Sequence, residues 1–273
     1  MAQVTVGRRS GPDGRGGGRQ LDWTELAALG LGLVDTHVHT VYSDGQSRVT
    51  DVENVCHERG VGCCITDHNE IRGSLALVER GRVPTAPSLE VGSREKIELL
   101  VIFRRAEECE EFFRTQVEPY RRKRWHAFLP RGLTFLIEAA RDYEALVSVP
   151  HPYAPLWKNI AYGQTRRESV GRVLGEADCI EIMNGSLTWR ANRRAEKLCR
   201  RLAKVPLGGS DSHRIGTIGS VLSVFDRKVT SENLFSLIRQ DRVSGFLSLD
   251  GRPHYMSNTW QVLKRHTTKL VAP

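Results

Sequence analysis

Residues 33–45 read Leu-Val-Asp-Thr-His-Val-His-Thr-Val-Tyr-Ser-Asp-Gly, and the interpretation of the whole chain starts from them. The apolar, β-branched character of residues 31–41 predicts a buried strand. His37 and His39 stand two positions apart in that strand, so both imidazoles should point to the same side. Asp44 follows just beyond the strand end. Because imidazole is the commonest protein metal ligand, this stretch predicts the beginning of a metal site. The alternative is a strand with two polar residues on its solvent face.

Length and composition limit the class of protein. The chain has 273 residues, 40% of them hydrophobic, which suits one large α/β domain or two small ones and excludes general disorder. Its formal net charge of +8 indicates either an anionic partner or simply a soluble surface. The six cysteines follow no C-x-x-C pattern, so we expect reduced, buried thiols. Without a signal peptide or a membrane-spanning apolar stretch, we expect a cytoplasmic protein with no membrane partner.

Strand and helix patterns alternate along the chain. The helical spacing over 49–59, with Gly60 as C-cap, lies between the first strand and a buried strand at 61–69. This strand–helix–strand order implies a right-handed crossover and parallel pairing. Further strands are expected at 89–91, 97–103, 145–149, 178–184, from 206, 221–225 and 243–249, with helices at 70–80, 106–117, one ending at 140, 188–204 and 231–239.

Seven or so such units predict one α/β domain, a closed or nearly closed parallel barrel. We expect this barrel domain over residues 21–250. Residues 1–20 read as a disordered, basic, glycine-rich arm, and residues 251–273 as a tail of unknown structure.

Polar side chains recur where the predicted strands end. Those positions are occupied by Asp44, His68, Glu90, His151, Asp211 and His213. In parallel barrels the working residues lie on loops at the C-terminal ends of the strands. Scattered surface residues would not follow the strand ends so consistently, so these side chains predict one shared site.

These motifs resemble those of the polymerase-and-histidinol-phosphatase (PHP) family over about residues 33–225. The residues that carry the resemblance are Asp35-x-His37-x-His39-Thr40…Ser43-Asp44-Gly45, Ile65-Thr66-Asp67-His68-Asn69, Glu90, His151-Pro152 and Gly209-Ser210-Asp211-Ser212-His213. The resemblance implies a distorted, TIM-barrel-like (β/α)7 barrel that holds two or three divalent ions (Mn, Fe or Zn). It also implies the hydrolysis of phosphate esters.

The resemblance further implies how the metals are held. By motif position, the first metal would be bound by His37, His39, Glu90 and Asp211, the second by Glu90 and His151, and the third by Asp44, His68 and His213. Many family members place a histidine in the next strand, where this chain has Glu98. Either Glu98 replaces that ligand or the second metal is weakly held, with His126 as another candidate.

We predict that Glu98 is a metal ligand. Both alternation phases of the strand Ile97-Glu98-Leu99-Leu100-Val101 are apolar, so both of its faces should be buried. A carboxylate there is costly unless it is paired or bound to a cation. An ion pair with an arginine is the alternative.

The predicted reaction is attack by a metal-bridging hydroxide on a phosphate ester, with Glu90, Asp211 and His213 as catalytic residues. Lys158, Arg190 and Arg214 lie near the motifs and are candidates to bind the phosphate. The helix over 188–204 carries a basic face, which either guides a polyanion or is simply solvated. That face comprises Arg190, Arg194, Lys197, Arg201 and Lys204. The run at 121–126, which includes Trp125, is equally ambiguous.

We therefore expect a metal-dependent hydrolase acting on ester bonds. Its substrate would be a phosphomonoester of a small metabolite or nucleotide, or the phosphodiester of a nucleic acid. Two alternatives stay open: a non-catalytic nucleic-acid-binding or interaction module on a PHP scaffold, and a hydrolase of carbon–nitrogen bonds on a related barrel. No obligate protein partner is evident.

Overall fold

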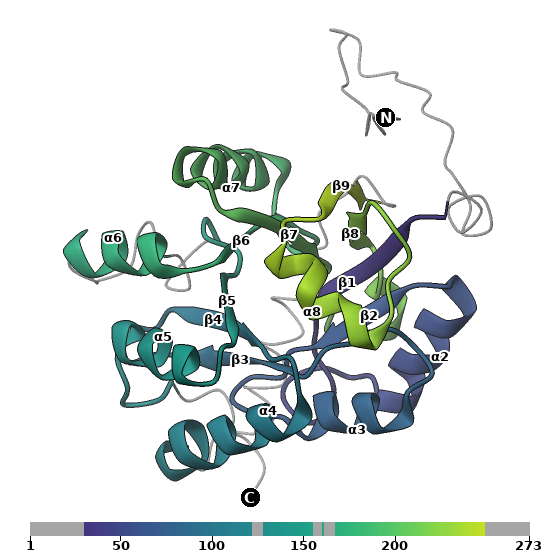
Figure 1. The fold of residues 1–273 in the computed structure, drawn as a ribbon, viewed down its shortest axis with the longest axis horizontal. Coiled ribbons are helices and arrows are strands. Elements are labelled where there is room, and N and C mark those ends of the chain that lie inside the picture. The colour runs from purple at the N-terminus through teal and green to yellow at the C-terminus, as the bar shows by residue number, and fades with distance from the viewer. Residues whose placement is uncertain (1–29, 122–127, 155–159, 161–166, 249–273) are drawn as a thin grey trace, which may run out of the picture.

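The computed structural model describes residues 30–121, 128–154, 160 and 167–248, which form a mixed α/β fold (Figure 1). Its strands are β1 (Gly32–Val38), β2 (Gly62–Ile65), β3 (Ser88–Gly92), β4 (Glu98–Ile102), β5 (Leu146–Val149), β6 (Cys179–Asn184), β7 (Val205–Gly209), β8 (Val221–Phe225) and β9 (Val243–Ser248). The α-helices are α2 (Val49–Arg59), α3 (Arg72–Arg80), α4 (Ala106–Phe112), α5 (Leu133–Asp142), α6 (Arg167–Glu176), α7 (Trp189–Leu202) and α8 (Ser231–Arg239). The predicted arm and tail, Trp125, His126 and Lys158 lie outside the described residues.

Most of the predicted elements are confirmed, because their signals are local. Helix α2 has the predicted bounds, and Gly60 follows it with φ 63°, the left-handed conformation that favours glycine. The helix expected over 106–117 is α-helical only as far as Phe112 and continues as a π-helical turn over Phe113–Val117. The helix expected over 188–204 ends at Leu202. Lys204 therefore lies beyond the basic face, and its Nζ donates to the carbonyl of Gly175 (2.6 Å).

The strands form two hydrogen-bonded sheets. One has the order β2-β1-β8-β9 and the other the order β3-β4-β5-β6-β7. Isolated parallel bridges, Val38 with Ser212 and His68 with Glu90, lie between strands of different sheets. Strand β1 pairs with β2 in parallel, as predicted, and β5, β6 and β7 are also parallel. The predicted closed (β/α)7 barrel is not confirmed.

The expectation of parallel pairing throughout is wrong. Four pairs are antiparallel: β1 with β8, β3 with β4, β4 with β5, and β8 with β9. The connection between β3 and β4 shows the reason, because a parallel crossover needs about a dozen residues. This shorter connection closes as a turn in which the N–H of Ser93 donates to the carbonyl of Ile97 (2.8 Å). Glu98, the first residue of β4, consequently lies opposite Gly92, the last residue of β3.

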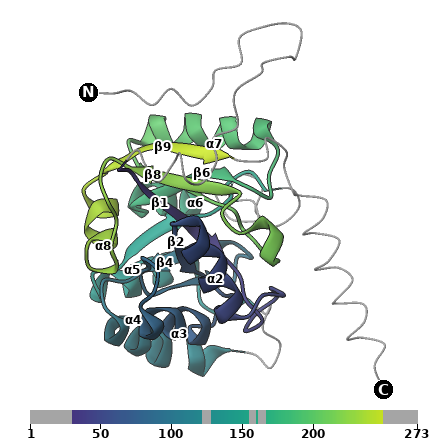
Figure 2. The same cartoon turned by 90° about the vertical axis from the view of Figure 1, so that its right-hand side faces the viewer.

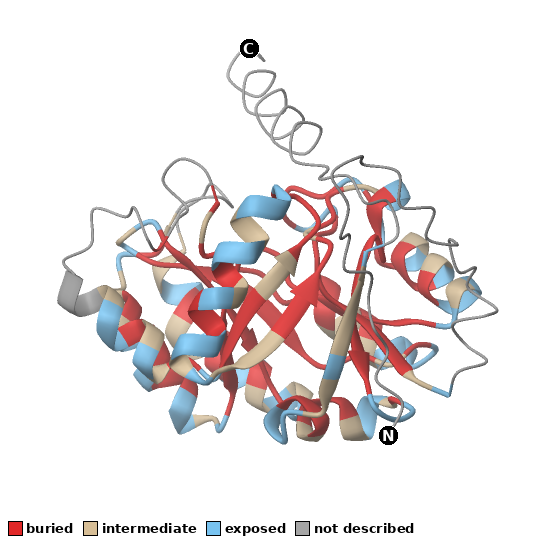
Figure 3. Cartoon of the chain, turned by 90° about the horizontal axis from the view of Figure 1, so that it is seen from above, coloured by how far each residue is buried: buried red, intermediate tan, exposed pale blue. Residues whose placement is uncertain are grey.

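The apolar core lies between the sheets and the helices that cover them (Figures 2 and 3). Helix α5 shows why such helices form, because Leu133, Leu136, Ile137 and Ala140 recur every three or four residues and are all buried. The six cysteines are all buried, as expected, and free. No helix among the described residues is both long and apolar enough to cross a bilayer.

Candidate metal centre

The nine predicted metal-ligating side chains come together at one edge of the sheets. They follow β1 (His39 and Asp44), β2 (His68), β5 (His151) and β7 (Asp211 and His213), or lie in β1 (His37), in β3 (Glu90) and at the start of β4 (Glu98). Eight of these residues are buried, and the Asp211 side chain is 15% exposed. The antiparallel β3–β4 hairpin explains Glu98, since it brings the beginning of β4 to the edge where the other strands end.

The nine side chains form four overlapping groups, in each of which the ligand atoms lie within 4.8 Å of one another. The groups are His39, Asp44, His68 and His213; His37, Glu90 and His151; His37, His39 and Asp211; and His68, Glu90 and Glu98. The grouping follows the three sets implied by the family resemblance only in part, since Glu90 is grouped with His37 and His151 but not with His39 and Asp211. His39 also lies beside the Asp44 set, and Glu98 is grouped with His68 rather than with His151.

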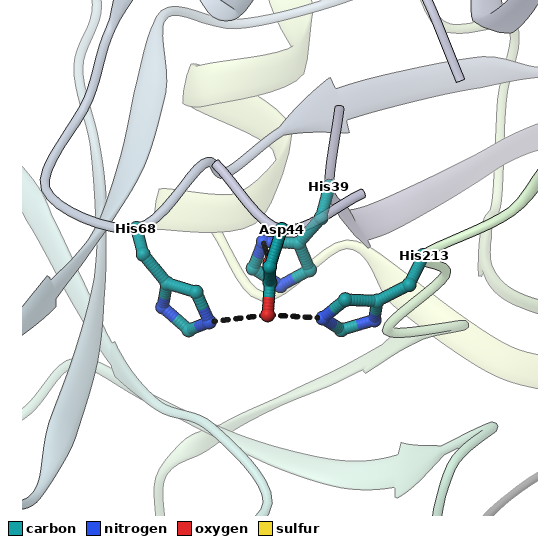
Figure 4. A group of neighbouring side chains, drawn as sticks. All are labelled: His39, Asp44, His68 and His213. Carbon is teal, nitrogen blue, oxygen red and sulfur yellow. Dashed lines mark ion pairs between the residues drawn. The ribbon is translucent and has the colours of Figure 1, made fainter. Parts of the chain in front are cut away.

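The first group is shown in Figure 4. Oδ2 of Asp44 lies 3.1 Å from Nε2 of His213 and 3.6 Å from Nε2 of His68. Nδ1 of His39 is 3.7 Å from Oδ1 of Asp44 and has no hydrogen-bond partner among the described residues. A buried polar nitrogen without a partner is costly, and a cation held by this group would satisfy it.

His37 and His39 meet through their ring nitrogens. Their Nε2 atoms are 3.0 Å apart, and Nδ1 of His37 lies 3.0 Å from Oε1 of Glu181. The carboxylate can only accept, so Nδ1 of His37 donates to it, and in the neutral imidazole Nε2 presents a lone pair. A lone pair aimed at the neighbouring imidazole and at Asp211 (Nε2 to Oδ1, 3.7 Å) is what metal coordination requires.

Glu90 joins the groups. Its Oε2 lies 2.9 Å from Nδ1 of His68 and 3.4 Å from Nε2 of His39, and its Oε1 lies 3.1 Å from Nε2 of His151. Oε1 of Glu98 is 3.5 Å from Nδ1 of His68, and its Oε2 is 3.7 Å from Nε2 of His151. One carboxylate that faces members of several groups has the geometry of a bridging ligand, and the nitrogen and oxygen donors suit divalent ions.

The carboxylates and imidazoles of the centre shift one another's pKa values. Burial lowers the pKa values of His37, His151 and His213, but the neighbouring carboxylates outweigh it and raise all three. Burial raises the pKa values of Asp44 and Glu90, but the surrounding imidazoles outweigh it and hold both carboxyls well below their usual range. The pKa of Asp211 is likewise lowered, chiefly by His37 against the effect of burial. Burial, together with His213 and His68, lowers the pKa of His39 to about 3, so this imidazole is neutral, as a metal ligand must be.

Three buried carboxylates support the centre without belonging to the metal groups. The sequence analysis did not predict these supporting roles. Glu181 in β6 orients His37 and also accepts the backbone N–H of His151 (2.8 Å). Asp35 accepts hydrogen bonds from the backbone and hydroxyl of Ser210 (2.8 and 2.6 Å). Asp67 does the same for Thr40 (2.7 and 2.6 Å). Burial raises the pKa values of Asp35 and Asp67 to about 6 against these hydrogen bonds.

The sequence did contain signals for these supports. Asp35 and Asp67 stand inside the motifs quoted above, two and one positions before histidines of the site. Glu181 lies between Ile180 and Ile182 in a strand, which is the signature that singled out Glu98. An ionised side chain in an apolar strand predicts a polar partner, although it does not identify that partner.

The backbone is held in the left-handed region at two ligand positions. His151 has φ 29° and Asp211 has φ 52°, conformations that non-glycine residues rarely adopt. Such conformations persist only where the surrounding structure imposes them, and they cluster at functional sites. Here each follows a parallel strand and turns the ligand side chain into the centre.

The structure describes two of the three predicted phosphate-binding residues. Arg190 is exposed in the first turn of α7, with its guanidinium carbon 5.8 Å from the centre of the Trp189 ring. Arg214 is half-buried directly after His213. Both therefore lie beside segments that carry site residues.

The comparisons with known proteins bear on the family and the fold. The family described as PHP-associated matches residues 189–243. No curated protein matches the sequence. The resemblance to the PHP family that the motifs indicate is confirmed by this match together with the solved structures of the same fold.

Three solved structures illustrate the likeness. PsfC from Pseudomonas syringae is 18% identical with a TM-score of 0.58 over 87% of this chain and 99% of its own. A two-domain Bacteroides vulgatus protein containing a predicted PHP-like metal-dependent phosphoesterase is 15% identical, with a TM-score of 0.57 over 85% and 70% of the two chains. The lesion-specific endonuclease PfuEndoQ from Pyrococcus furiosus is 18% identical, with a TM-score of 0.63 over 81% and 60%. At these identities the likeness shows the shared fold.

Proposed function

We propose that this protein is a hydrolase, a metal-dependent phosphoesterase that holds two or three divalent ions in the centre described above. The observation that carries the proposal is the set of four overlapping ligand groups, which place nine side chains around one buried centre. The fold shared with a PHP-like phosphoesterase and with a lesion-specific endonuclease supports the same chemistry. One ion would be held by His39, Asp44, His68 and His213.

The remaining groups would hold the other ions. Glu90 would bridge between His37, His151 and Asp211 on one side and His68 with Glu98 on the other. Bound divalent ions would supply positive charge for the phosphate oxygens and would lower the pKa of water. Glu181 would keep His37 in the tautomer whose Nε2 faces the centre, because its carboxylate accepts the Nδ1 proton.

Asp211 and His213 would act on the substrate side. The Asp211 side chain is the more exposed of the two, and Nδ1 of His213 lies 3.0 Å from the carbonyl of Asp211. This contact makes Nδ1 of His213 the protonated nitrogen and directs its Nε2 towards Asp44. Arg190, Arg214 and Lys158 are proposed to bind the phosphate, which is either a monoester of a small molecule or nucleotide or a phosphodiester of nucleic acid. The second candidate function is a binding module without catalysis, which the basic face of α7 favours.

Metal analysis and a substrate panel test the proposal. Protein purified without chelator should carry two to three divalent ions per chain by elemental analysis, and His37→Ala should lose at least one of them. The panel consists of phosphomonoesters, phosphodiesters and short oligonucleotides, each tested with Mn, Zn and Fe, with Asp211→Asn as the matched inactive variant. Folded protein that binds no metal would contradict the centre, and metal-loaded protein that hydrolyses no ester would favour the binding module.

A further inference from the structure

The first turn of α7 carries an aromatic and arginine cluster on the protein surface. The Trp189 side chain is 60% exposed, and the guanidinium carbons of Arg190 and Arg193 lie 5.8 and 5.6 Å from its ring centre. The Arg194 guanidinium lies 4.8 Å from the centre of the Tyr153 ring. We call Tyr153, Trp189, Arg190, Arg193 and Arg194 the α7 cluster.

Two links place the α7 cluster beside the metal centre. The amide of Asn192, in the same helical turn, forms hydrogen bonds with the backbone N–H and carbonyl of Asn184 (3.2 and 3.1 Å). The Asn184 side chain in turn donates to Oδ2 of Asp211 (3.4 Å). Tyr153, two residues after His151, forms the second link through its contact with Arg194. One end of α7 is therefore tied to Asp211 through Asn192 and Asn184, and to the segment after His151 through Tyr153.

Most of the exposed apolar side chains lie on segments that also carry site residues. Five large hydrophobic residues are exposed among the described residues: Val41, Tyr42, Phe135, Trp189 and Ile215. Val41 and Tyr42 lie between His39 and Asp44, and Ile215 lies two residues after His213. Trp189 directly precedes Arg190, a predicted phosphate-binding residue. Among these five described residues, Phe135 alone lies on a segment that carries none of the predicted metal-ligating or phosphate-binding residues. An exposed aromatic or apolar rim around a charged centre marks a contact surface.

The charge of α7 suits a polyanionic partner. The helix has six basic residues and a single acid, Glu196, which pairs with Arg200 (2.6 Å). Arg190, Arg193, Arg194, Lys197 and Arg201 are all exposed. A helix of 14 residues is about 21 Å long, which exceeds the reach of one phosphate group. A chain of phosphates can use its whole length.

The exposed tryptophan bears on whether that polyanion is single-stranded or double-stranded. Aromatic rings stack on bases of any sequence, and an arginine beside the ring adds attraction to the same base. A base can reach the Trp189 ring only when it is not stacked within a duplex. We infer that the α7 cluster binds a single-stranded nucleic acid and leads its phosphodiester backbone to the metal centre. This inference names the substrate class of the proposed phosphoesterase and rests on that function for the cleavage step.

The test measures binding and cleavage separately on the full chain. A fluorescein-labelled oligothymidylate of about 20 nucleotides, the corresponding RNA and a matched duplex are titrated by fluorescence anisotropy. Each strand is then run on a denaturing gel. The single strands should bind more tightly than the duplex. Trp189→Ala should weaken single-strand binding by about 5- to 100-fold.

The control is Phe135→Ala, because Phe135 is also an exposed aromatic residue with an arginine, Arg131, over its ring (4.4 Å). This variant should bind the oligothymidylate as the unmodified protein does. Changing Arg193 and Arg194 together to Gln should reduce the slope of log Kd against log salt by about 1.4, or about 0.7 for each phosphate that is no longer neutralised. In Trp189→Ala, the rate of oligonucleotide cleavage should fall by a larger factor than the rate of hydrolysis of bis(4-nitrophenyl) phosphate, a small diester without a base.

Three results would overturn the inference: equal binding of duplex and single strand, equal effects of Trp189→Ala and Phe135→Ala, or an unchanged salt slope. Tight single-strand binding without hydrolysis of any ester would keep the α7 cluster and reject the phosphoesterase. Hydrolysis of the small diester without single-strand binding would keep the phosphoesterase and reject the role of the α7 cluster.

Discussion

At the scale of single residues, the centre depends on carboxylates placed where an apolar side chain would ordinarily be. Glu98 and Glu181 both lie in strands and are buried, yet they serve different purposes. Glu98 lies 3.5 Å from His68 within a metal group, whereas Glu181 holds the far side of the His37 ring. Their sequence surroundings are alike, so the neighbouring strand decides which of them joins a candidate metal group.

Glu98 should be a metal ligand. Glu98→Ala should lose about one ion per chain and most of the hydrolysis, because it removes one of the oxygen donors beside His68 and His151. Glu98→His should restore the metal content and shift the preferred ion towards Zn, since imidazole is a softer donor than carboxylate. Elemental analysis and activity with each ion provide the measurement.

The matched control is Glu107→Ala, which removes an exposed carboxylate from α4. It should keep both metal content and rate. If Glu98→Ala behaves like this control, then Glu98 has a structural role and the second ion is held by other residues.

At the scale of elements, β1 and β7 must approach closely for their loops to share ions. A glycine makes this approach feasible: a Cβ on Gly209 would lie 2.5 Å from Cβ of His37 and 2.7 Å from its backbone nitrogen. Neither atom can move without displacing β1. The same contact therefore sets both the packing of the two strands and the position of a metal ligand.

Gly209→Ala should destabilise the protein by about 1–3 kcal/mol, the usual cost of overpacking, and should weaken metal binding as His37 is displaced. Chemical denaturation and metal titration measure the two effects. Gly171→Ala in α6 is the control, because a Cβ there meets nothing within 4 Å. That change should instead stabilise the protein by about 0.5–1 kcal/mol through helix propensity. Equal stability of the two variants would mean that β7 can move away from β1 at little cost.

At the scale of the whole molecule, the centre joins loops from both sheets. Ligands from β1 and β2 in one sheet meet ligands from β3, β4, β5 and β7 in the other. Bound ions would therefore hold the two sheets together, and their removal would leave buried carboxylates without a compensating divalent charge.

Metal removal should lower the thermal stability of the whole protein. At a free metal concentration 100 times the Kd, binding to the folded state alone contributes about 2.7 kcal/mol. For a domain of this size, that corresponds to an increase of about 5–10 °C in the melting temperature. Differential scanning calorimetry of chelated and Mn-reloaded protein measures the shift. A melting temperature that stays the same, with Mn shown to be bound, would indicate that the unfolded chain binds the ion as tightly as the folded centre does.

Much of the fold and site could be predicted from the sequence, because the signals concerned are local. The period of the apolar residues determined most helices and strands, and α2, α8 and β8 have the predicted bounds. The position of polar residues at strand ends predicted the side chains that meet at the centre. The spacing of two residues predicted that His37 and His39 point to the same side. In the structure their Nε2 atoms are 3.0 Å apart.

Only the tertiary structure decided how the strands pair and which side chains share a group. Pairing direction depends on contacts between distant segments, and a short turn was enough to reverse β4 and bring Glu98 to the centre. The role of Glu181 depends on His37, which lies 144 positions earlier in the chain. The link from α7 to Asp211 through Asn192 and Asn184 likewise depends on the packing of α7 beside β6. Local sequence sets what each segment can form, but partners far along the chain are chosen by the packing of the whole fold.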